Sequence, residues 1–324
     1  MQSSQSIDRP VLLSVVVPAY NEQEVIETFH DRLSGVLASL PFDVEVIYVN
    51  DGSGDDTLSI LRALRRRDPR VAVIDLSRNF GKEIALTAGL DHARGDAVVV
   101  IDADLQDPPE LIPNLVEPWR DEGYDVVYAQ RISRAGESWL KKKTASWFYR
   151  LMQNVGEIPI PPDTGDFRLL SRRTVDSIRS LRERHRFMKG LFTWVGFRQC
   201  AVPYERDARN AGVSKWNYWR LWNLALEGVT SATLVPLKVS SYIGLIIAVL
   251  AFATGIWIIF KTLAFGDPVQ GWPSLMVVVL FLGGVQLVAL GVIGEYLGRL
   301  FNEAKGRPLY FLNAVELPEE PREE

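Results

Sequence analysis

The clearest chemical signal in the sequence is the pair Asp102 and Asp104, two carboxylates with only Ala103 between them. They follow Ala97–Ile101, an apolar run that is typical of a buried strand. Mg²⁺ and Mn²⁺ prefer oxygen ligands and often take only one or two from protein, while diphosphate oxygens and water complete the shell. Such an ion neutralises the charge that builds on a departing diphosphate. The pair therefore predicts a metal-assisted nucleotide site.

Polar clusters also follow three other apolar runs in the N-terminal half. They are Pro18–Glu22, Asn50–Ser53 and Ser77–Asn79. Any one of these clusters, taken alone, is equally well explained as a solvated loop with a helix cap. Ligands bind beyond the carboxyl ends of the strands in open α/β sheets. Four clusters in such positions therefore favour one shared site.

The elements that must position these residues alternate along the N-terminal half. The predicted strands are Leu12–Val17, Val44–Val49, Val71–Leu76, Ala97–Ile101 and Val126–Ala129, and the predicted helices are Glu24–Leu37, Thr57–Arg67, Glu83–His92 and Glu110–Glu122. The strands are nearly continuous runs of Val, Ile and Leu, which suits a parallel sheet covered on both faces. Strands that alternate with helices predict a doubly wound α/β domain.

Two long stretches near the C-terminus, Val239–Phe260 and Pro268–Gly294, contain no charged side chain. Each is long enough to cross a bilayer, which takes about 20 helical residues, so we predict transmembrane helices at about 239–261 and 272–296. Two buried core helices are the alternative. Basic residues flank the pair on both sides: Lys215, Arg220 and Lys238 before it, and Arg299, Lys305 and Arg307 after it. The positive-inside rule then predicts a hairpin with both flanks in the cytoplasm.

Composition and missing motifs exclude several other classes of protein. The formal net charge is −4, and the acidic C-terminal end accounts for it, so we expect no nucleic-acid partner. Cys200 is the single cysteine, which rules out an intramolecular disulfide and a zinc site built from several cysteines. The sequence also lacks a Gly-x-Gly-x-x-Gly dinucleotide motif, a complete P-loop and a Gly-x-Ser-x-Gly elbow.

Taken together, the motifs resemble those of family 2 glycosyltransferases. The resemblance rests on Pro18–Glu22, Val49–Ser53, Asp102–Pro109, Thr164–Arg168, Arg186–Gly190, Ser214–Trp216 and Gly291–Tyr296. With the two apolar spans, the chain is similar to the polyprenyl-phosphate hexosyltransferases of the dolichol-phosphate mannosyltransferase-like branch. Within that branch it is most similar to the bactoprenol (undecaprenyl-phosphate) glucosyltransferases, over nearly its whole length.

This resemblance implies a GT-A fold, which is a Rossmann-like, mostly parallel α/β sheet, followed by a two-helix transmembrane hairpin. It implies inverting transfer of a hexose, glucose first, from a UDP-sugar to polyprenyl phosphate with Mg²⁺ or Mn²⁺. GlcNAc, galactose or an aminoarabinose derivative as the sugar, or GDP-mannose as the donor, remain alternatives. So does a catalytically silent subunit that binds a sugar nucleotide. A processive polysaccharide synthase is disfavoured because its Gln-x-x-Arg-Trp signature is absent.

The resemblance also implies roles for individual residues. Asp166 stands where the family has its candidate catalytic base. The residues expected to bind the nucleotide sugar are Pro18, Tyr20, Glu22, Asp51, Asp102, Asp104 and Gln106, and those expected to bind the acceptor phosphate or the diphosphate are Arg131, Arg206, Arg209, Ser214 and Lys215. Asp104 and Asp102 are the expected metal ligands, with Asp104 the more direct one.

The role of Asp166 can also be argued from chemistry. A phosphomonoester has a second pKa of about 6, so a lipid phosphate is already anionic near neutral pH and needs little deprotonation. We therefore expect Asp166 to position the acceptor or the positive charge that develops on the sugar, rather than to remove a proton. The alternative is a structural role, in which Asp166 caps a helix or pairs with Arg168.

The predicted organisation has four parts: a cytoplasmic catalytic domain at 1–215, an interfacial helix at 216–238, the membrane hairpin at 239–298 and a cytoplasmic tail at 299–324. The acidic end of that tail is expected to be disordered. This arrangement predicts a multi-pass protein of the inner (cell) membrane with its catalytic domain and both termini in the cytoplasm. The resemblance adds a homo-oligomer, such as a tetramer.

Overall fold

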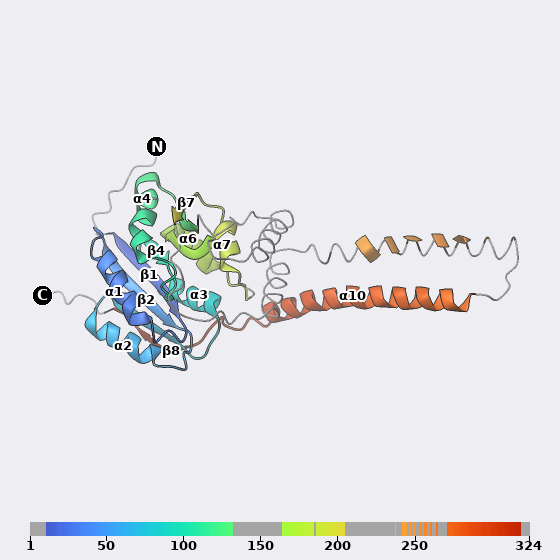
Figure 1. Ribbon diagram of the computed structural model, residues 1–324, viewed down its shortest axis with the longest axis horizontal. Helices are drawn as coiled ribbons and strands as arrows, with labels where there is room; N and C mark the ends of the chain where they lie inside the picture. The colour runs from blue at the N-terminus through green and yellow to red at the C-terminus, as the bar shows by residue number, and fades with distance from the viewer. Residues whose placement is uncertain are drawn as a thin grey trace. The chain divides into compact units, whose positions relative to one another are not determined.

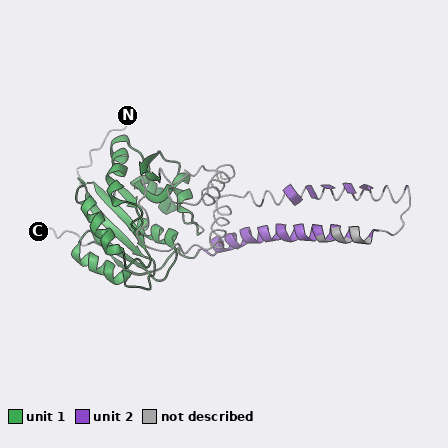
Figure 2. Ribbon diagram, in the orientation of Figure 1, with its two compact units in different colours: residues 1–153, 158–216, 307–324 green, residues 154–157, 217–306 purple. Residues whose placement is uncertain are grey.

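The computed structural model describes residues 11–131, 164–184, 186–204 and 271–318, together with scattered positions between 237 and 264. The chain forms two compact units (Figure 2). The first unit includes most of the N-terminal part and also residues 307–324, whereas the second includes residues 217–306. The chain therefore leaves the first unit, forms the second, and returns to the first at its C-terminal end.

The first unit is organised around one sheet, whose described strands have the order β7-β5-β6-β4-β1-β2-β3-β8 (Figure 1). These strands are β1 (Leu12–Ala19), β2 (Asp43–Asn50), β3 (Val71–Leu76), β4 (Ala97–Val100), β5 (Val126–Arg131), β6 (Thr164–Ser171), β7 (Gln199–Tyr204) and β8 (Leu312–Glu316). The pairs β1–β2, β1–β4, β2–β3 and β5–β7 are parallel. β6 lies antiparallel between β4 and β5, and β8 lies antiparallel on β3. This mostly parallel sheet confirms the predicted GT-A-like fold class.

Helices cover both faces of the sheet. One face is packed by α1 (Ile26–Leu37), α2 (Thr57–Arg67) and α4 (Ile112–Glu122), and the other by α3 (Lys82–His92), α6 (Arg172–Ser180) and α7 (Met188–Trp194). Within β1, Val15 and Val17 join the first core and Val16 joins the second. Because alternate side chains of a strand face opposite sides, a strand with two covered faces must be apolar throughout. The continuous apolar runs of the sequence have this origin.

The strand β8 comes from the far end of the chain. Its Asn313 amide donates a 3.3 Å hydrogen bond to the carboxylate of Asp75 on β3. Its Glu316 forms a 2.8 Å ion pair with Arg62 of α2. The C-terminal segment is therefore held to the sheet by side chains as well as by main-chain pairing.

The sequence predicts a tail over residues 299–324 and no strand within it. An edge strand is held by main-chain hydrogen bonds to its neighbour, and five residues carry too little periodicity to reveal such a partner. The expectation of disorder concerned the acidic end, of which residues 319–324 lie outside the described part of the chain.

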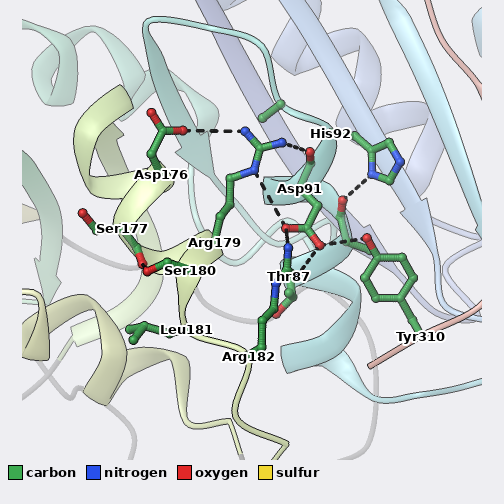
Figure 3. Close-up of polar contacts among 12 residues, drawn as sticks. Thr87, Asp91, His92, Asp176, Ser177, Arg179, Ser180, Leu181, Arg182 and Tyr310 are labelled. Carbon is green, nitrogen blue, oxygen red and sulfur yellow. Dashed lines mark hydrogen bonds and ion pairs between the residues drawn. The ribbon is translucent and has the colours of Figure 1, made fainter. Parts of the chain in front are cut away.

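Asp91, near the end of α3, connects this C-terminal segment to the helices beside it (Figure 3). Its carboxylate accepts two hydrogen bonds from Arg182, at 2.8 and 3.0 Å, and one from the hydroxyl of Tyr310, at 2.8 Å. Arg179 of α6 donates to the main-chain carbonyl of Asp91. Asp91 thus joins α3, α6 and the segment that leads into β8.

The second unit contains α10 (Trp272–Ala304), a helix of 33 residues. At a rise of 1.5 Å per residue it is about 50 Å long, more than the roughly 30 Å of a hydrocarbon core. Its segment Phe281–Ala304 has a mean hydropathy of 1.5 and meets the length and composition of a membrane span. Large apolar side chains such as Leu287 and Val288 are exposed along it. The predicted second span, 272–296, lies within α10.

The remaining parts of the predicted hairpin are described only in places. Of the predicted first span, 239–261, the structure describes scattered positions, all of them helical. The predicted interfacial helix, 216–238, lies outside the described residues except for Leu237. In the described part of the chain, the candidate span is therefore the one within α10.

Candidate active site

The loops that follow β1 and β2 are joined at the carboxyl edge of the sheet. The main-chain N–H of Asn21 donates to Ser53 at 3.1 Å, and the N–H of Gly54 donates to the side chain of Asn21 at 2.9 Å. Tyr20 is exposed beside this joint, and Pro18 is partly buried at the end of β1. The structure therefore brings these two predicted nucleotide-binding residues next to the loop that begins with Asp51.

A further hydrogen bond connects Glu22 with the start of α2. The N–H of Glu22 donates to the hydroxyl of Thr57, the first residue of α2, at 2.9 Å. The Glu22 side chain is partly buried, so it lies at the margin of the site rather than in the core. The loop from Tyr20 to Glu22 is thus fixed by main-chain N–H groups that donate to Ser53 and Thr57.

Asp51 is buried and binds the main chain of a neighbouring turn. Its carboxylate accepts hydrogen bonds from the main-chain N–H groups of Phe80 and Gly81, at 2.7 and 2.9 Å. Burial raises the pKa of Asp51, and these two hydrogen bonds and the charge of Arg78 offset part of that effect. Asp51 therefore fixes the turn that precedes Lys82, which is a role that its motif alone did not reveal.

The sheet register brings Asp102 and Asp166 together. β4 and β6 are antiparallel, with Val100 opposite Arg168. The strand pairing ends there, and Asp102 follows Val100 by two residues while Asp166 precedes Arg168 by two, so both lie at the same end of this strand pair. The two aspartates are distant in sequence, and this antiparallel strand pairing is what places them at one point of the sheet edge.

Lys82 lies between these two carboxylates. Its Nζ atom is 2.6 Å from Oδ2 of Asp102 and 2.5 Å from Oδ2 of Asp166. Burial works against its charge, yet the charges of Asp102 and Asp166 raise the pKa of Lys82 above its ordinary value. Lys82 is therefore an ammonium ion that screens the repulsion between the two aspartates.

The two aspartates respond differently to this surrounding. Burial raises the pKa of Asp102, and Lys82 compensates only part of the effect. Burial also acts to raise the pKa of Asp166, but the charges of Lys82 and Lys189 and the hydrogen bond from Lys82 outweigh it and leave that pKa below its usual range. Asp166 is therefore the more firmly ionised of the pair.

The remaining contacts of Asp166 leave one oxygen available. Within the described residues, its Oδ1 atom is buried and has no hydrogen-bond partner. Arg168 donates to the main-chain carbonyls of Asp166 and Gly165, at 3.3 and 2.7 Å, and stacks on the Phe192 ring. Arg168 thus fixes the main chain under Asp166, whereas the hydrogen bonds to the carboxylate come from Lys82.

The loop that carries Asp104 is shaped by its own side chains. Asp104 accepts a 3.1 Å hydrogen bond from the main-chain N–H of Gln106, and Leu105 between them has a φ of 59°. Asp107 follows and accepts a 2.6 Å hydrogen bond from the hydroxyl of Tyr204. Arg131, a predicted acceptor residue, donates to the same hydroxyl at 3.3 Å. The structure therefore connects the Asp104 loop to the ends of β5 and β7.

The predicted site residues in the described part of the chain all lie along this edge of the first unit. They are Pro18, Tyr20, Glu22, Asp51, Asp102, Asp104, Gln106, Arg131 and Asp166. The other predicted acceptor residues, Arg206, Arg209, Ser214 and Lys215, lie outside the described residues. The roles assigned to all of these residues stay predictions.

Four residues that complete the site have no role predicted from the sequence. Lys82, Asp107, Lys189 and Tyr204 contact or face the predicted residues. Asp107 and Lys189 lie within the quoted motifs, which is a signal that could have marked them. Lys82 lies outside those motifs, and its partners Asp102 and Asp166 belong to segments that the sequence alone does not pair.

The residues present can supply some, but not all, of the ligands of a divalent cation. In the described ranges, no group of three or more His, Cys, Asp or Glu side chains is arranged to hold a metal ion. Asp102 and Asp104 offer carboxylate oxygens on one loop, which is the hard-oxygen chemistry that Mg²⁺ and Mn²⁺ prefer. Two protein carboxylates are sufficient when the diphosphate supplies the other ligands, so the pair fits such an ion.

Comparison with known proteins gives consistent matches. Residues 14–179 match the model of glycosyl transferase family 2, and residues 235–300 match the GtrB C-terminal hairpin. The chain is 55% identical over 301 residues to an uncharacterized glycosyltransferase of Synechocystis, covering 93% of this chain and 94% of that protein. It is 51% identical over 300 residues to the SfII prophage-derived bactoprenol glucosyl transferase of Shigella flexneri, covering 93% and 97%.

One further relative and one solved structure are also similar to this chain. A prophage bactoprenol glucosyl transferase homolog of Escherichia coli is 48% identical over 304 residues, covering 94% of this chain and 99% of that protein. Among solved structures, glucosyl-3-phosphoglycerate synthase from Mycobacterium tuberculosis with uridine-diphosphate is 23% identical, with a TM-score of 0.48, covering 68% and 79%. With its carboxylate site at the sheet edge and these matches, the chain belongs to glycosyl transferase family 2 and carries a GtrB C-terminal hairpin.

Proposed function

We propose that this protein transfers glucose from UDP-glucose to a polyprenyl phosphate, such as undecaprenyl phosphate, with inversion at the sugar carbon. The proposal rests on relatives named bactoprenol glucosyl transferases, which are 48–51% identical over most of both chains. The structural observation that supports it is the meeting of Asp102 and Asp166 around Lys82 at the carboxyl edge of the sheet. Ligands of open α/β sheets bind at this edge.

In this proposal the donor diphosphate lies near Asp102 and Asp104. A divalent cation, Mg²⁺ or Mn²⁺, would be held by these two carboxylates and would neutralise the charge that develops on the departing diphosphate. Tyr20 and Glu22 lie beside Asp51 at the ends of β1 and β2, where they would contact the nucleotide. Tyr20 is 48% exposed, which leaves its ring free to contact a base.

Asp166 acts by charge in this mechanism. The pKa of its carboxyl is below the usual range, so it is ionised and a weak proton acceptor near neutral pH. The acceptor phosphate, with a second pKa of about 6, needs no strong base. The buried Oδ1 atom can therefore stabilise the positive charge that develops on the sugar carbon.

The membrane part fits a lipid acceptor. Removing a polyprenyl tail from the bilayer costs roughly 0.8 kcal/mol per CH₂, so the enzyme must bring its site to the headgroups. A segment of α10, Phe281–Ala304, meets the length and composition of a membrane span, and the matched hairpin at residues 235–300 includes most of α10. We propose a multi-pass inner-membrane protein with the catalytic domain and both termini in the cytoplasm, assembled as a homo-oligomer such as a tetramer.

The test is transfer of radiolabelled sugar from UDP-glucose to a short-chain polyprenyl phosphate, with and without Mg²⁺ or Mn²⁺. Wild type is expected to form a metal-dependent glycolipid, and Asp104→Ala is expected to form none. Product from another UDP-sugar or from GDP-mannose would keep the mechanism and replace only the donor. A folded protein that binds UDP but makes no product from any donor would overturn the proposal and support a silent nucleotide-binding subunit.

A further inference from the structure

Lys82 has a fixed main-chain position and a partly exposed side chain. It is the first residue of α3, and the two residues before it, Phe80 and Gly81, are bound through their N–H groups to Asp51. Gly81 has a φ of 96°, a conformation that favours glycine. The start of α3 is therefore held rigidly, while the Lys82 side chain remains 44% exposed.

The two partners of Lys82 are less accessible than Lys82 itself. The side chains of Asp102 and Asp166 are 25% and 10% exposed. The ammonium group lies against Oδ2 of each carboxylate. A second cation that binds Asp102 therefore competes with the Lys82 ammonium for the same carboxylate.

Lys82 does not neutralise both aspartates. Lys82 carries one positive charge against the two negative charges of Asp102 and Asp166, so the group of three has a net charge of −1. Lys189 and Arg168 also face Asp166 and lower its pKa, whereas Glu83 lies near it with the opposite charge. Asp102 has Lys82 as its hydrogen-bonded cation among the described residues. Asp102 is therefore the carboxylate for which a second cation can compete.

We propose that Lys82 is an internal competitor of the divalent cation at Asp102. Before the donor binds, its ammonium group holds Asp102 and Asp166 together and keeps the affinity for a free metal ion low. When the metal arrives with the donor diphosphate, the diphosphate oxygens supply the missing ligands and Asp102 exchanges Lys82 for the metal. Lys82 then stays with Asp166. This inference rests on the proposed function for the identity of the donor.

Lys82 is thus a positioning residue that makes metal binding depend on the nucleotide. A lysine with a purely structural role would affect metal binding only by weakening the fold. A competitor has the opposite signature, because its removal must increase the affinity for the metal. The sign of the change separates the two roles.

The experiment measures Mn²⁺ binding to the full-length protein in detergent by electron paramagnetic resonance, without nucleotide and with UDP. Without UDP, Lys82→Met is expected to bind Mn²⁺ about tenfold or more tightly than wild type, since it removes a unit charge next to the ligand. Lys82→Arg keeps the charge and is expected to bind weakly, like wild type. Lys305→Met, which changes an exposed lysine beyond α10, is the matched control and is expected to bind as wild type does.

Two outcomes would overturn the inference. One is Mn²⁺ affinity in Lys82→Met that equals or falls below that of wild type without UDP. The other is an equal gain in Lys82→Arg and Lys82→Met, which would exclude charge as the cause. If Lys82→Met does not fold, Lys82→Gln removes the same charge with a polar side chain. Its Mn²⁺ affinity without UDP is then compared with those of wild type and Lys82→Arg.

This result is separable from the proposed function. Tighter Mn²⁺ binding by Lys82→Met in a protein that transfers no sugar would leave the competition intact and refute the reaction. Sugar transfer by wild type, together with unchanged Mn²⁺ binding by the variants, would support the reaction and refute the competition.

Discussion

The hydroxyl of Tyr204, the last residue of β7, donates a 2.6 Å hydrogen bond to the carboxylate of Asp107. Asp107 belongs to the loop that carries Asp102 and Asp104, and the same hydroxyl accepts a hydrogen bond from Arg131. Tyr204 is therefore the point at which the carboxylate loop, β5 and β7 meet. The predicted acceptor residues Arg206 and Arg209 follow it directly in the sequence.

Tyr204→Phe tests this connection. Loss of the hydroxyl is expected to lower the free energy of unfolding by about 1 kcal/mol, because a buried carboxylate loses its donor. It is also expected to raise the KM for the donor more than it lowers kcat, because the Asp104 loop is positioned less well. Steady-state kinetics and denaturant unfolding measure both effects. Tyr124→Phe, on the connection between α4 and β5, is the control; equal effects in the two variants would refute the connection.

Asp166→Asn removes the charge and keeps the shape of the side chain. If Asp166 stabilises charge in the transition state, sugar transfer is expected to fall by about 100-fold or more. UDP binding is expected to change little, because the residues proposed to contact the base and ribose follow β1 and β2. Activity and UDP affinity are measured on the same preparation. Asp176→Asn, on the exposed face of α6, is the matched control, and activity close to wild type in Asp166→Asn would remove Asp166 from the mechanism.

Glu83 predicts a pH dependence of stability. Burial and the nearby charge of Asp166 raise the pKa of Glu83 from 4.5 to about 7. The folded protein therefore binds this proton more tightly than the unfolded chain does. The resulting stabilisation is fully present below pH 4.5 and is lost as the pH rises through about 7.

The measurement compares the free energy of unfolding of wild type and Glu83→Gln across this pH range. The neutral Gln cannot titrate, so its stability is expected to change less between the acidic and the alkaline end. Glu117→Gln changes an exposed glutamate of α4 and is expected to keep the wild-type profile. Parallel profiles for wild type and Glu83→Gln would show that Glu83 does not carry this effect.

The Asp91 cluster predicts that the C-terminal segment contributes to the stability of the first unit. Tyr310→Phe removes one hydrogen bond to Asp91 and is expected to lower the free energy of unfolding by about 1 kcal/mol. Asp91→Ala removes the common acceptor of Arg182 and Tyr310 and is expected to lower it further. Thermal unfolding ranks the two variants. Equal stability of Asp91→Ala and wild type would show that the Asp91 contacts do not contribute and that the segment is held by β8 and its side chains.

Gly52 predicts a strong effect of a single methyl group. Its φ is 63°, and a Cβ atom there would press against the main chain of Arg78 and Asn79. Gly52→Ala is expected to lower the free energy of unfolding by about 2 kcal/mol or more, since the left-handed conformation alone costs roughly 1–2 kcal/mol. Gly35→Ala lies in α1, where a Cβ atom meets nothing within 4 Å. This change is expected to raise the free energy of unfolding by about 0.5–1 kcal/mol, because alanine favours a helix more than glycine does. Denaturant unfolding measures the free energy of unfolding of both variants. A Gly52→Ala variant as stable as wild type would contradict the close approach of residue 52 to the main chain of Arg78 and Asn79.

Much of the fold follows from local patterns in the sequence. The apolar runs at β1 to β5 predicted strands close to those observed, because a strand covered on both faces must be apolar at every position. The polar clusters after these runs predicted the edge of the sheet that carries the site. The long uncharged stretch that contains most of α10 predicted a membrane span, because only composition and length are needed for that inference.

The tertiary structure alone decided which of these polar residues meet. Asp166 reaches Asp102 because β6 inserts antiparallel between β4 and β5, and nothing local to either residue encodes that register. Lys82 becomes the shared cation because Asp51 fixes the turn before it, and β8 joins the sheet from the far end of the chain. Residue types and spacing along one strand are local properties and can be read from a sequence. Strand order, register and the charge balance between distant side chains depend on pairings that only the folded chain makes.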